Sequence, residues 1–279
     1  MKDLALVLGG GGPVGVAWEA GLLAGLFDEG VDVRRAEFVL GTSAGSIVGS
    51  AVAMGVDLHL MAELQRTIAQ GAGGPPPDIS KLIGFLMRLP PINEPGLELR
   101  QEIGRYALEA KPEGEEKYID RLGANLAPGE WPERFACTAV DATSGEFRLW
   151  RKADGVELKR AVAASCAVPG IYPSVTIGGR RWMDGGMRSS LNVDQAAGHQ
   201  RVLAVAVIPA MARARFMPRF EAEAAPVRAA GGEMMLVAPD DASAEAFGPN
   251  LMDASRRPAA MEAGRAQGRK EAAKLKAFV

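Results

Sequence analysis

The chain has 279 residues, of which 48% are hydrophobic and 24% charged, and its formal net charge at pH 7 is −2. These proportions are ordinary for a soluble globular protein with a sizeable core, and the small net charge argues against nucleic acid as a partner. Cys137 and Cys166 both lie in apolar runs without metal-ligand neighbours, so we expect two buried thiols and no metal site.

The N-terminal region alternates twice between strand and helix patterns. Leu4–Leu8 is a continuous apolar run, typical of a strand buried on both faces of a parallel sheet, and a helical pattern follows over Val14–Glu29. A second apolar strand, Phe38–Leu40, leads through "GTSAGS" into an Ala/Val-rich helix over Ser46–Met54. Two strand–turn–helix units in succession predict an α/β fold with a mainly parallel sheet.

The middle of the chain has a different character. The Gly/Pro-rich stretch "GAGGPPPD" at 71–78 and further prolines break it into short helical patterns, so we predict a helical insertion over 57–130. Two hairpins follow, one joining Phe135–Val140 to Phe147–Trp150 and one with Gly178-Gly179 as its turn.

Arg201–Ile208 is predicted as the last buried strand. The segment 209–232 is rich in Ala, Arg and Met with little periodicity, and we take it as a candidate mobile lid or membrane-surface patch. Residues 243–279 are predicted as a C-terminal helical segment, with a basic-faced helix over Arg256–Phe278. We find no internal repeat and expect residues 1–279 to form one domain.

Four consecutive glycines, "GGGG" at 9–12, separate the first strand from the first helix. Bare backbone N–H groups at a helix N-terminus suit either a dinucleotide phosphate or the oxyanion of an acyl-transfer reaction. A dinucleotide-binding fold needs an acidic residue at the end of its second strand, but that strand runs into Gly41-Thr42. The sequence therefore favours an oxyanion hole.

The second turn contains Gly41-Thr42-Ser43-Ala44-Gly45, a G-x-S-x-G placed between an apolar strand and a helix. This is the context of a nucleophile elbow, in which a strained serine presents its hydroxyl. The alternative is that Ser43 merely caps the following helix.

A serine nucleophile needs a base, and the chain offers two arrangements. Ser43, Asp184 and His199 have the chain order of an α/β-hydrolase triad. Alternatively, Asp184 in "RWMDGGM" leaves a short strand into a Gly-Gly turn that permits close packing, so it is a candidate base by itself. The other histidine, His59, is predicted on the exposed side of a helix.

Taken in order, "GGGGPVG", "GTSAG" and "DGG" resemble the patatin-like phospholipases, and the likeness extends through "AVAASCAVPGIYPSV". The resemblance implies a three-layer α/β/α fold and a lipid acyl hydrolase with a Ser–Asp dyad, no histidine, no metal and no cofactor. By position, Ser43 is the nucleophile and Asp184 the general base. Gly10, Gly11 and Gly12 form the oxyanion hole, and Gly41 and Gly45 flank the nucleophile.

One position departs from this family pattern. Many members carry Arg or Lys two residues after the triple glycine, whereas this chain has Pro13-Val14. The choice between phospholipid and neutral ester therefore stays open. We expect a cytoplasmic enzyme that acts on a lipid or small ester and contacts membranes at most peripherally; the alternative is a non-catalytic acyl-lipid-binding protein.

Overall fold

One sheet of eight strands runs through the described part of the chain, which comprises residues 3–70, 76–88, 90, 95–110, 112–209 and 212–279 of a computed structural model. The strand order is β5-β6-β3-β2-β1-β7-β8, and β4 pairs with β3. The parallel strands are β1 (Leu4–Leu8), β2 (Phe38–Gly41), β3 (Phe135–Asp141), β7 (Arg201–Val205) and β8 (Glu233–Val237). The antiparallel pairings involve β4 (Phe147–Arg151), β5 (Val175–Ile177) and β6 (Arg180–Asp184).

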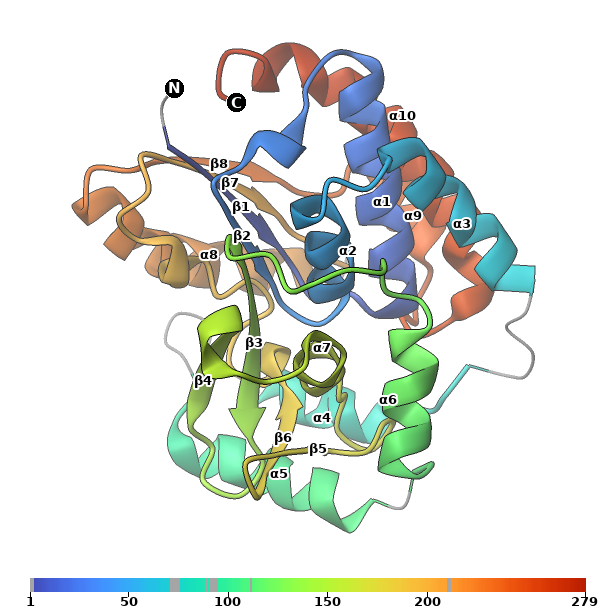
Figure 1. Cartoon of the computed structure of the whole chain (residues 1–279), viewed down its shortest axis with the longest axis vertical. Coiled ribbons are helices and arrows are strands. Elements are labelled where there is room, and N and C mark those ends of the chain that lie inside the picture. Colours follow the sequence, from blue (N-terminus) through green and yellow to red (C-terminus); the bar gives the residue numbers. More distant parts are fainter. Residues whose placement is uncertain (1–2, 71–75, 89, 91–94, 111, 210–211) are drawn as a thin grey trace.

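Helices cover both faces of this sheet (Figure 1). Those that share the larger core are α1 (Gly12–Asp28), α2 (Ala44–Ala53), α3 (Leu58–Gln70), α6 (Glu115–Gly123), α7 (Leu158–Ser165), α9 (Asp241–Phe247) and α10 (Arg257–Leu275). The opposite face is covered by α8 (Arg213–Ala229). The predicted three-layer α/β/α arrangement with a mainly parallel sheet is confirmed.

Two further helices, α4 (Ser80–Met87) and α5 (Leu97–Glu109), lie beside the antiparallel part of the sheet in the lower half of Figure 1. Phe85 and Ile103 pack there against Val140 and Met183, in a third apolar cluster. The region predicted as a helical insertion, 57–130, therefore contains α3 to α6; the breaks at 71–75, 89, 91–94 and 111 lie outside the described residues.

The C-terminal helix α10 packs directly on α1 because both helices present glycines at their contact. A Cβ atom on Gly21 or Gly25 of α1 would lie 2.0 or 2.1 Å from a carbonyl oxygen of α10. A Cβ atom on Gly264 or Gly268 of α10 would lie 2.3 or 2.2 Å from a carbonyl oxygen of α1. The two backbones thus touch, which fixes the position of the N-terminal end of α10 relative to the glycine loop that precedes α1.

The structure corrects two expectations near the C-terminus. The segment predicted at 209–232 contains the helix α8 (Arg213–Ala229), although Pro218 and Pro226 lie inside it. It buries Phe220, Ala224 and Val227, which have the spacing of one helical face, so the lack of periodicity predicted for this segment is wrong. Residues 210–211 lie outside the described part. The strand at 201–208 is not the last one either, because β8 pairs with β7 in parallel.

The cysteines and the apolar character of the helices give two further findings. Cys137 and Cys166 are buried and unbridged, as predicted. No helix within the described residues combines the length and the apolar character that a membrane span requires.

Candidate active site

The strands that carry Ser43 and Asp184 converge on one edge of β3. Gly41, the last residue of β2, pairs with Cys137 of β3, and Asp184, the last residue of β6, pairs with Ala139. β4 pairs along the other edge of β3 over the same stretch, so β2 and β6 share one edge. Because β2 is parallel and β6 antiparallel to β3, their carboxyl ends meet there, and this brings the two side chains together.

Ser43 occupies a strained turn between β2 and α2. Its backbone has φ 52° and ψ −117°, a conformation that costs a non-glycine residue on the order of 1–3 kcal/mol. The Ser43 carbonyl oxygen accepts hydrogen bonds from Ser46 Oγ at 2.6 Å and Cys166 Sγ at 3.2 Å. The surrounding contacts thus hold Ser43 in an unfavourable conformation that a plain helix cap does not require.

The glycines on either side of Ser43 are required by close contacts. A Cβ atom on Gly41 would lie 2.4 Å from the Gly45 carbonyl oxygen, and one on Gly45 would lie 2.2 Å from the Leu8 carbonyl oxygen. The Gly45 N–H also donates to the Gly9 carbonyl oxygen at 2.9 Å. The turn therefore packs directly against the end of β1 and the start of the glycine loop.

We expect Gly45→Ala to lower the free energy of unfolding by about 3 kcal/mol or more, because the added methyl group meets backbone that cannot move aside. Chemical denaturation measures this loss. Gly84→Ala is the matched control: Gly84 lies in α4 with nothing within 4 Å of its Cβ position, so the same substitution should stabilise by about 0.5–1 kcal/mol. A Gly45→Ala variant as stable as the wild type would contradict the packing described.

Asp184 is the buried carboxyl group beside Ser43, with 2% of its surface exposed. Burial raises its pKa to about 7, and hydrogen bonds from the Ser43 side chain and from the Gly186 N–H, the latter 2.7 Å from Oδ1, act in the opposite direction. Two other acidic residues near turns, Asp141 and Asp194, are instead ion-paired with arginines.

One short segment holds both Ser43 and Asp184. Ser165 Oγ accepts the Ser43 N–H at 3.0 Å, the Cys166 thiol contacts the Ser43 carbonyl, and the Ala167 carbonyl accepts the Asp184 N–H at 3.0 Å. These three residues belong to "AVAASCAVPGIYPSV", whose individual contacts no sequence pattern had indicated.

A buried network of hydrogen bonds stabilises the turn that contains Ser43. Thr42 Oγ1 lies 2.9 Å from Thr138 Oγ1 and accepts a hydrogen bond from Asn192 Nδ2 at 3.0 Å. Asn192 also donates to the Ser189 carbonyl at 2.7 Å and has a positive φ of 54°. The network links β2, β3 and the segment after Asp184, and sequence reasoning missed it because its members are far apart in the chain.

The glycine loop lies against Ser43: a Cβ atom on Gly10 would be 3.4 Å from the Ser43 Cβ. The Gly10 N–H donates to the Ser190 carbonyl at 2.8 Å, so this group already has an acceptor. Gly11 caps α1 and Gly12 is its first residue, with φ 57°. In the described part of the chain neither of their N–H groups has a backbone acceptor, and they lie at the positive end of the α1 dipole.

Ser43 opens into a cavity of about 130 Å³. Its apolar lining comes from Val16, Ile47, Ile68, Leu122, Val168 and Met252. Its polar lining comes from Gln65, Tyr118, Arg121, Asn125, Tyr172 and Arg257. The cavity thus joins an apolar wall to several hydrogen-bond donors, which suits a ligand with an acyl chain and a polar group.

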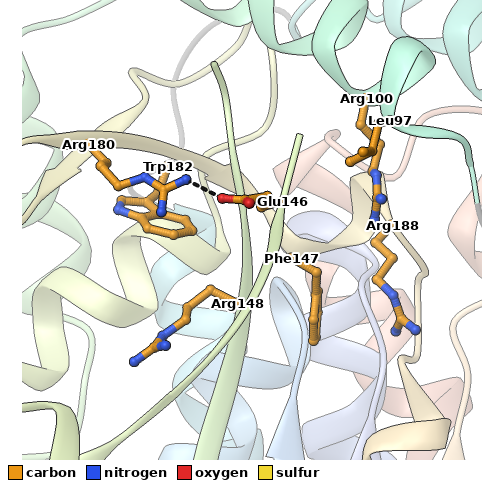
Figure 2. Close-up of a pocket in the computed structure, with 8 residues that line it drawn as sticks. All are labelled: Leu97, Arg100, Glu146, Phe147, Arg148, Arg180, Trp182 and Arg188. Atoms are coloured by element: carbon orange, nitrogen blue, oxygen red, sulfur yellow. Dashed lines mark hydrogen bonds and ion pairs between the residues drawn. The ribbon is translucent and has the colours of Figure 1, made fainter. Parts of the chain in front are cut away.

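A larger hollow of about 490 Å³ lies elsewhere, between β4, β6 and α5 (Figure 2). Arg180, Trp182 and Arg148 gather on one side of it, and Arg180 reaches Glu146. It contains neither Ser43 nor Asp184, and its arginines Arg148 and Arg180 are ion-paired with carboxylates. We therefore place the candidate site at the smaller cavity.

His199 lies far from Ser43. Its Nδ1 is 2.8 Å from both carboxylate oxygens of Asp3, and its ring stacks on Phe38 with centroids 5.1 Å apart. Phe38 begins β2 whereas Ser43 follows the end of that strand, a separation of roughly 16 Å at the rise of an extended chain. The alternative Ser43–Asp184–His199 triad is therefore wrong.

Neither the other histidine nor a metal site changes this picture. His59 lies on α3, where its Nδ1 is 3.5 Å from Asp28 Oδ1. Among the residues that the structure describes, no three His, Cys, Asp or Glu side chains lie close enough together to hold a metal ion.

A family model described as patatin-like phospholipase matches residues 6–197, which include the glycine loop, Ser43 and Asp184. Among solved structures, VipD from Legionella pneumophila is similar with a TM-score of 0.43 and 12% identity, over 97% of this chain and 67% of that one. The type III effector protein ExoU is similar with a TM-score of 0.39 and 15% identity, over 96% of this chain and 54% of that one. A chain of the ExoU–SpcU complex from Pseudomonas aeruginosa is similar with a TM-score of 0.39 and 18% identity, over 98% of this chain and 51% of that one. This chain therefore spans about half the length of the ExoU chains. The comparison with curated proteins gave no match.

Proposed function

The chain belongs to the patatin-like phospholipase family, whose general activity is ester hydrolysis on lipids, and from this premise we propose that it is a lipid acyl hydrolase with Ser43 as nucleophile and Asp184 as general base. The observation that carries the proposal is a buried carboxyl group, Asp184, whose pKa responds to the side chain of Ser43, a serine on a strained turn. A carboxyl group with a pKa of about 7 is half-ionised near neutral pH, which suits a group that must both accept and return a proton.

In the first step, Asp184 accepts the Ser43 hydroxyl proton while Oγ bonds to the ester carbonyl carbon. The carbonyl electron pair moves to the oxygen, and the Gly11 and Gly12 N–H groups at the α1 N-terminus stabilise the resulting oxyanion. When the tetrahedral intermediate collapses, its carbonyl re-forms, the ester C–O bond breaks, and Asp184 returns the proton to the leaving alkoxide. An acyl group then remains on Ser43.

In the second step, Asp184 accepts a proton from water as the water oxygen attacks the acyl carbonyl. The same two N–H groups stabilise the second oxyanion, and its collapse releases the carboxylic acid and returns the proton to Ser43. The burial of Asp184 excludes water from its carboxylate, which keeps this group basic enough for the role.

Hydrolysis of p-nitrophenyl octanoate tests the proposal, and His199→Ala serves as the control for the base. Because His199 lies at the opposite end of β2, we expect the variant to keep kcat within about twofold of the wild type. The loss of its partly exposed contact with the Asp3 carboxylate should cost at most about 1 kcal/mol of stability. A folded His199→Ala protein without esterase activity would overturn the dyad, and an inert wild type would favour a non-catalytic acyl-lipid-binding protein.

A further inference from the structure

Arg257, which lies near the C-terminal end of the sequence, lines the same cavity as Ser43. It is the first residue of α10, and the glycine contacts between α10 and α1 bring it beside the glycine loop. The preceding segment is tied to that loop as well, because the Val14 N–H donates to the Leu251 carbonyl at 3.2 Å. Arg257 and Ser43 therefore line the same cavity.

The guanidinium of Arg257 has an incomplete set of partners. In the described part of the chain its one hydrogen bond goes to the neutral side chain of Gln65, its buried Nε has no acceptor, and no carboxylate is ion-paired with it. Arg134 has no carboxylate partner among the described residues either, but it donates to four backbone carbonyl groups, as a structural arginine does.

This environment disfavours the positive charge. Burial lowers the pKa of Arg257 to about 10, so the group is still protonated at pH 7 but poorly solvated. A desolvated cation without a counter-charge is costly, and the cost is relieved when an anion binds. A guanidinium matches phosphate geometry by donating two parallel hydrogen bonds.

Further hydrogen-bond donors line the same cavity. Arg121 lies 5.6 Å above the rings of both Tyr118 and Tyr172, which stack on each other at 5.0 Å. Burial raises the pKa of Tyr172, so its hydroxyl remains a neutral donor. Arg121 is paired with Glu113, so Arg257 is the cation of this cavity that lacks an acidic partner among the described residues.

We propose that Arg257 is a specificity-determining residue that binds the phosphate group of the acyl ester cleaved at Ser43. The inference deepens the proposed function and rests on it. It also answers the question left by Pro13-Val14: the cation absent from the glycine loop is supplied by α10, which places a guanidinium in the same cavity. The favoured substrates are therefore phosphate-bearing acyl esters, such as lysophospholipids, and not neutral glycerides.

Binding tests this without catalysis. In a Ser43→Ala background, calorimetry should show octyl phosphate binding at least about tenfold tighter than octanol. Arg257→Met should remove this preference. Arg257→Lys keeps the positive charge but cannot donate two parallel hydrogen bonds, so it should retain part of the preference. Arg269→Met is the matched control, because Arg269 lies on the same helix, half-exposed and paired with Asp28. Equal binding of the two ligands by the parent protein, or an unchanged preference in a folded Arg257→Met, would overturn the proposal.

Kinetics separates this inference from the proposed function. For a lysophosphatidic acid and a monoacylglycerol with the same acyl chain, Arg257→Met should raise KM about tenfold or more for the first and leave the second unchanged. Equal losses on both substrates would contradict a role in phosphate recognition while leaving the dyad intact. If Ser43→Ala kept wild-type hydrolysis, the proposed function would fail, and the octyl phosphate measurement would still decide the role of Arg257.

Discussion

Ser43→Ala is expected to reduce ester hydrolysis by about 10⁵-fold or more, because it removes the hydroxyl that forms the acyl-enzyme and the comparable loss in a known serine hydrolase is on the order of 10⁶. The oxyanion donors and the cavity stay in place, so ester binding should persist while kcat falls. Steady-state hydrolysis of p-nitrophenyl octanoate, with circular dichroism to verify folding, measures the effect.

Ser50→Ala is the matched control for this variant. Ser50 lies on α2, the helix that follows Ser43; it is also buried, donates its hydroxyl to the Ile47 carbonyl at 2.8 Å, and is not among the residues that line the cavity. It should therefore keep its activity. The nucleophile assignment does not survive if Ser43→Ala retains more than a few per cent of the wild-type rate.

Asp184→Asn is expected to abolish turnover and, at the same time, to stabilise the fold above neutral pH. The folded-state pKa of about 7 lies above the ordinary value of about 3.9 for an unfolded chain, so ionisation of this carboxyl opposes folding. The wild type therefore loses stability as the pH rises from about 4 to about 7, and the loss is constant at higher pH. At pH 7 and above, the wild type has lost about 4 kcal/mol of its free energy of unfolding, which is the pKa difference multiplied by 1.36 kcal/mol per pH unit.

An asparagine at position 184 keeps an oxygen for the Gly186 N–H but has no charge to bury. Urea denaturation at pH 4 and pH 8 should show the variant gaining stability over the wild type only at the higher pH. In the wild type, kcat/KM should rise with pH through about 7, as Asp184 loses its proton.

A second carboxyl shows the opposite case. Asp141 is also buried, but Arg180 Nε lies 2.6 Å from its Oδ2, so Asp141→Asn should destabilise the protein at pH 8 by removing a charge partner. If Asp184→Asn were no more stable than the wild type at pH 8, or kept its activity, Asp184 would not be the buried base described.

Local patterns were enough to predict much of the fold. The buried strands at Leu4–Leu8 and Phe38–Gly41 are uninterrupted apolar runs, and the hairpin turn at Gly178-Gly179 uses positive φ angles that glycine favours. The helix α8 was not predicted because its sequence contains two prolines and only three of its residues are buried. In such segments the packing partner decides the structure more than the local sequence does.

The sequence predicted only those site residues that belong to a contiguous motif. Ser43 and the glycine loop are readable from the sequence, and the pairing of Ser43 with Asp184 came from the order of motifs in the family. That Gly10 gives its N–H to Ser190, and that Arg257 reaches the cavity, depend on contacts between segments distant in the chain. Neither periodicity nor spacing carries that information.

Covalent labelling is the most direct test of the central claim that Ser43, activated by Asp184, attacks an ester carbonyl. Wild-type protein treated with an alkyl fluorophosphonate should gain one adduct, which peptide mass spectrometry should locate on Ser43. The adduct should be absent in Ser43→Ala, form far more slowly in Asp184→Asn, and form at the wild-type rate in His199→Ala. Labelling at another residue, or none in folded wild-type protein, would contradict the account.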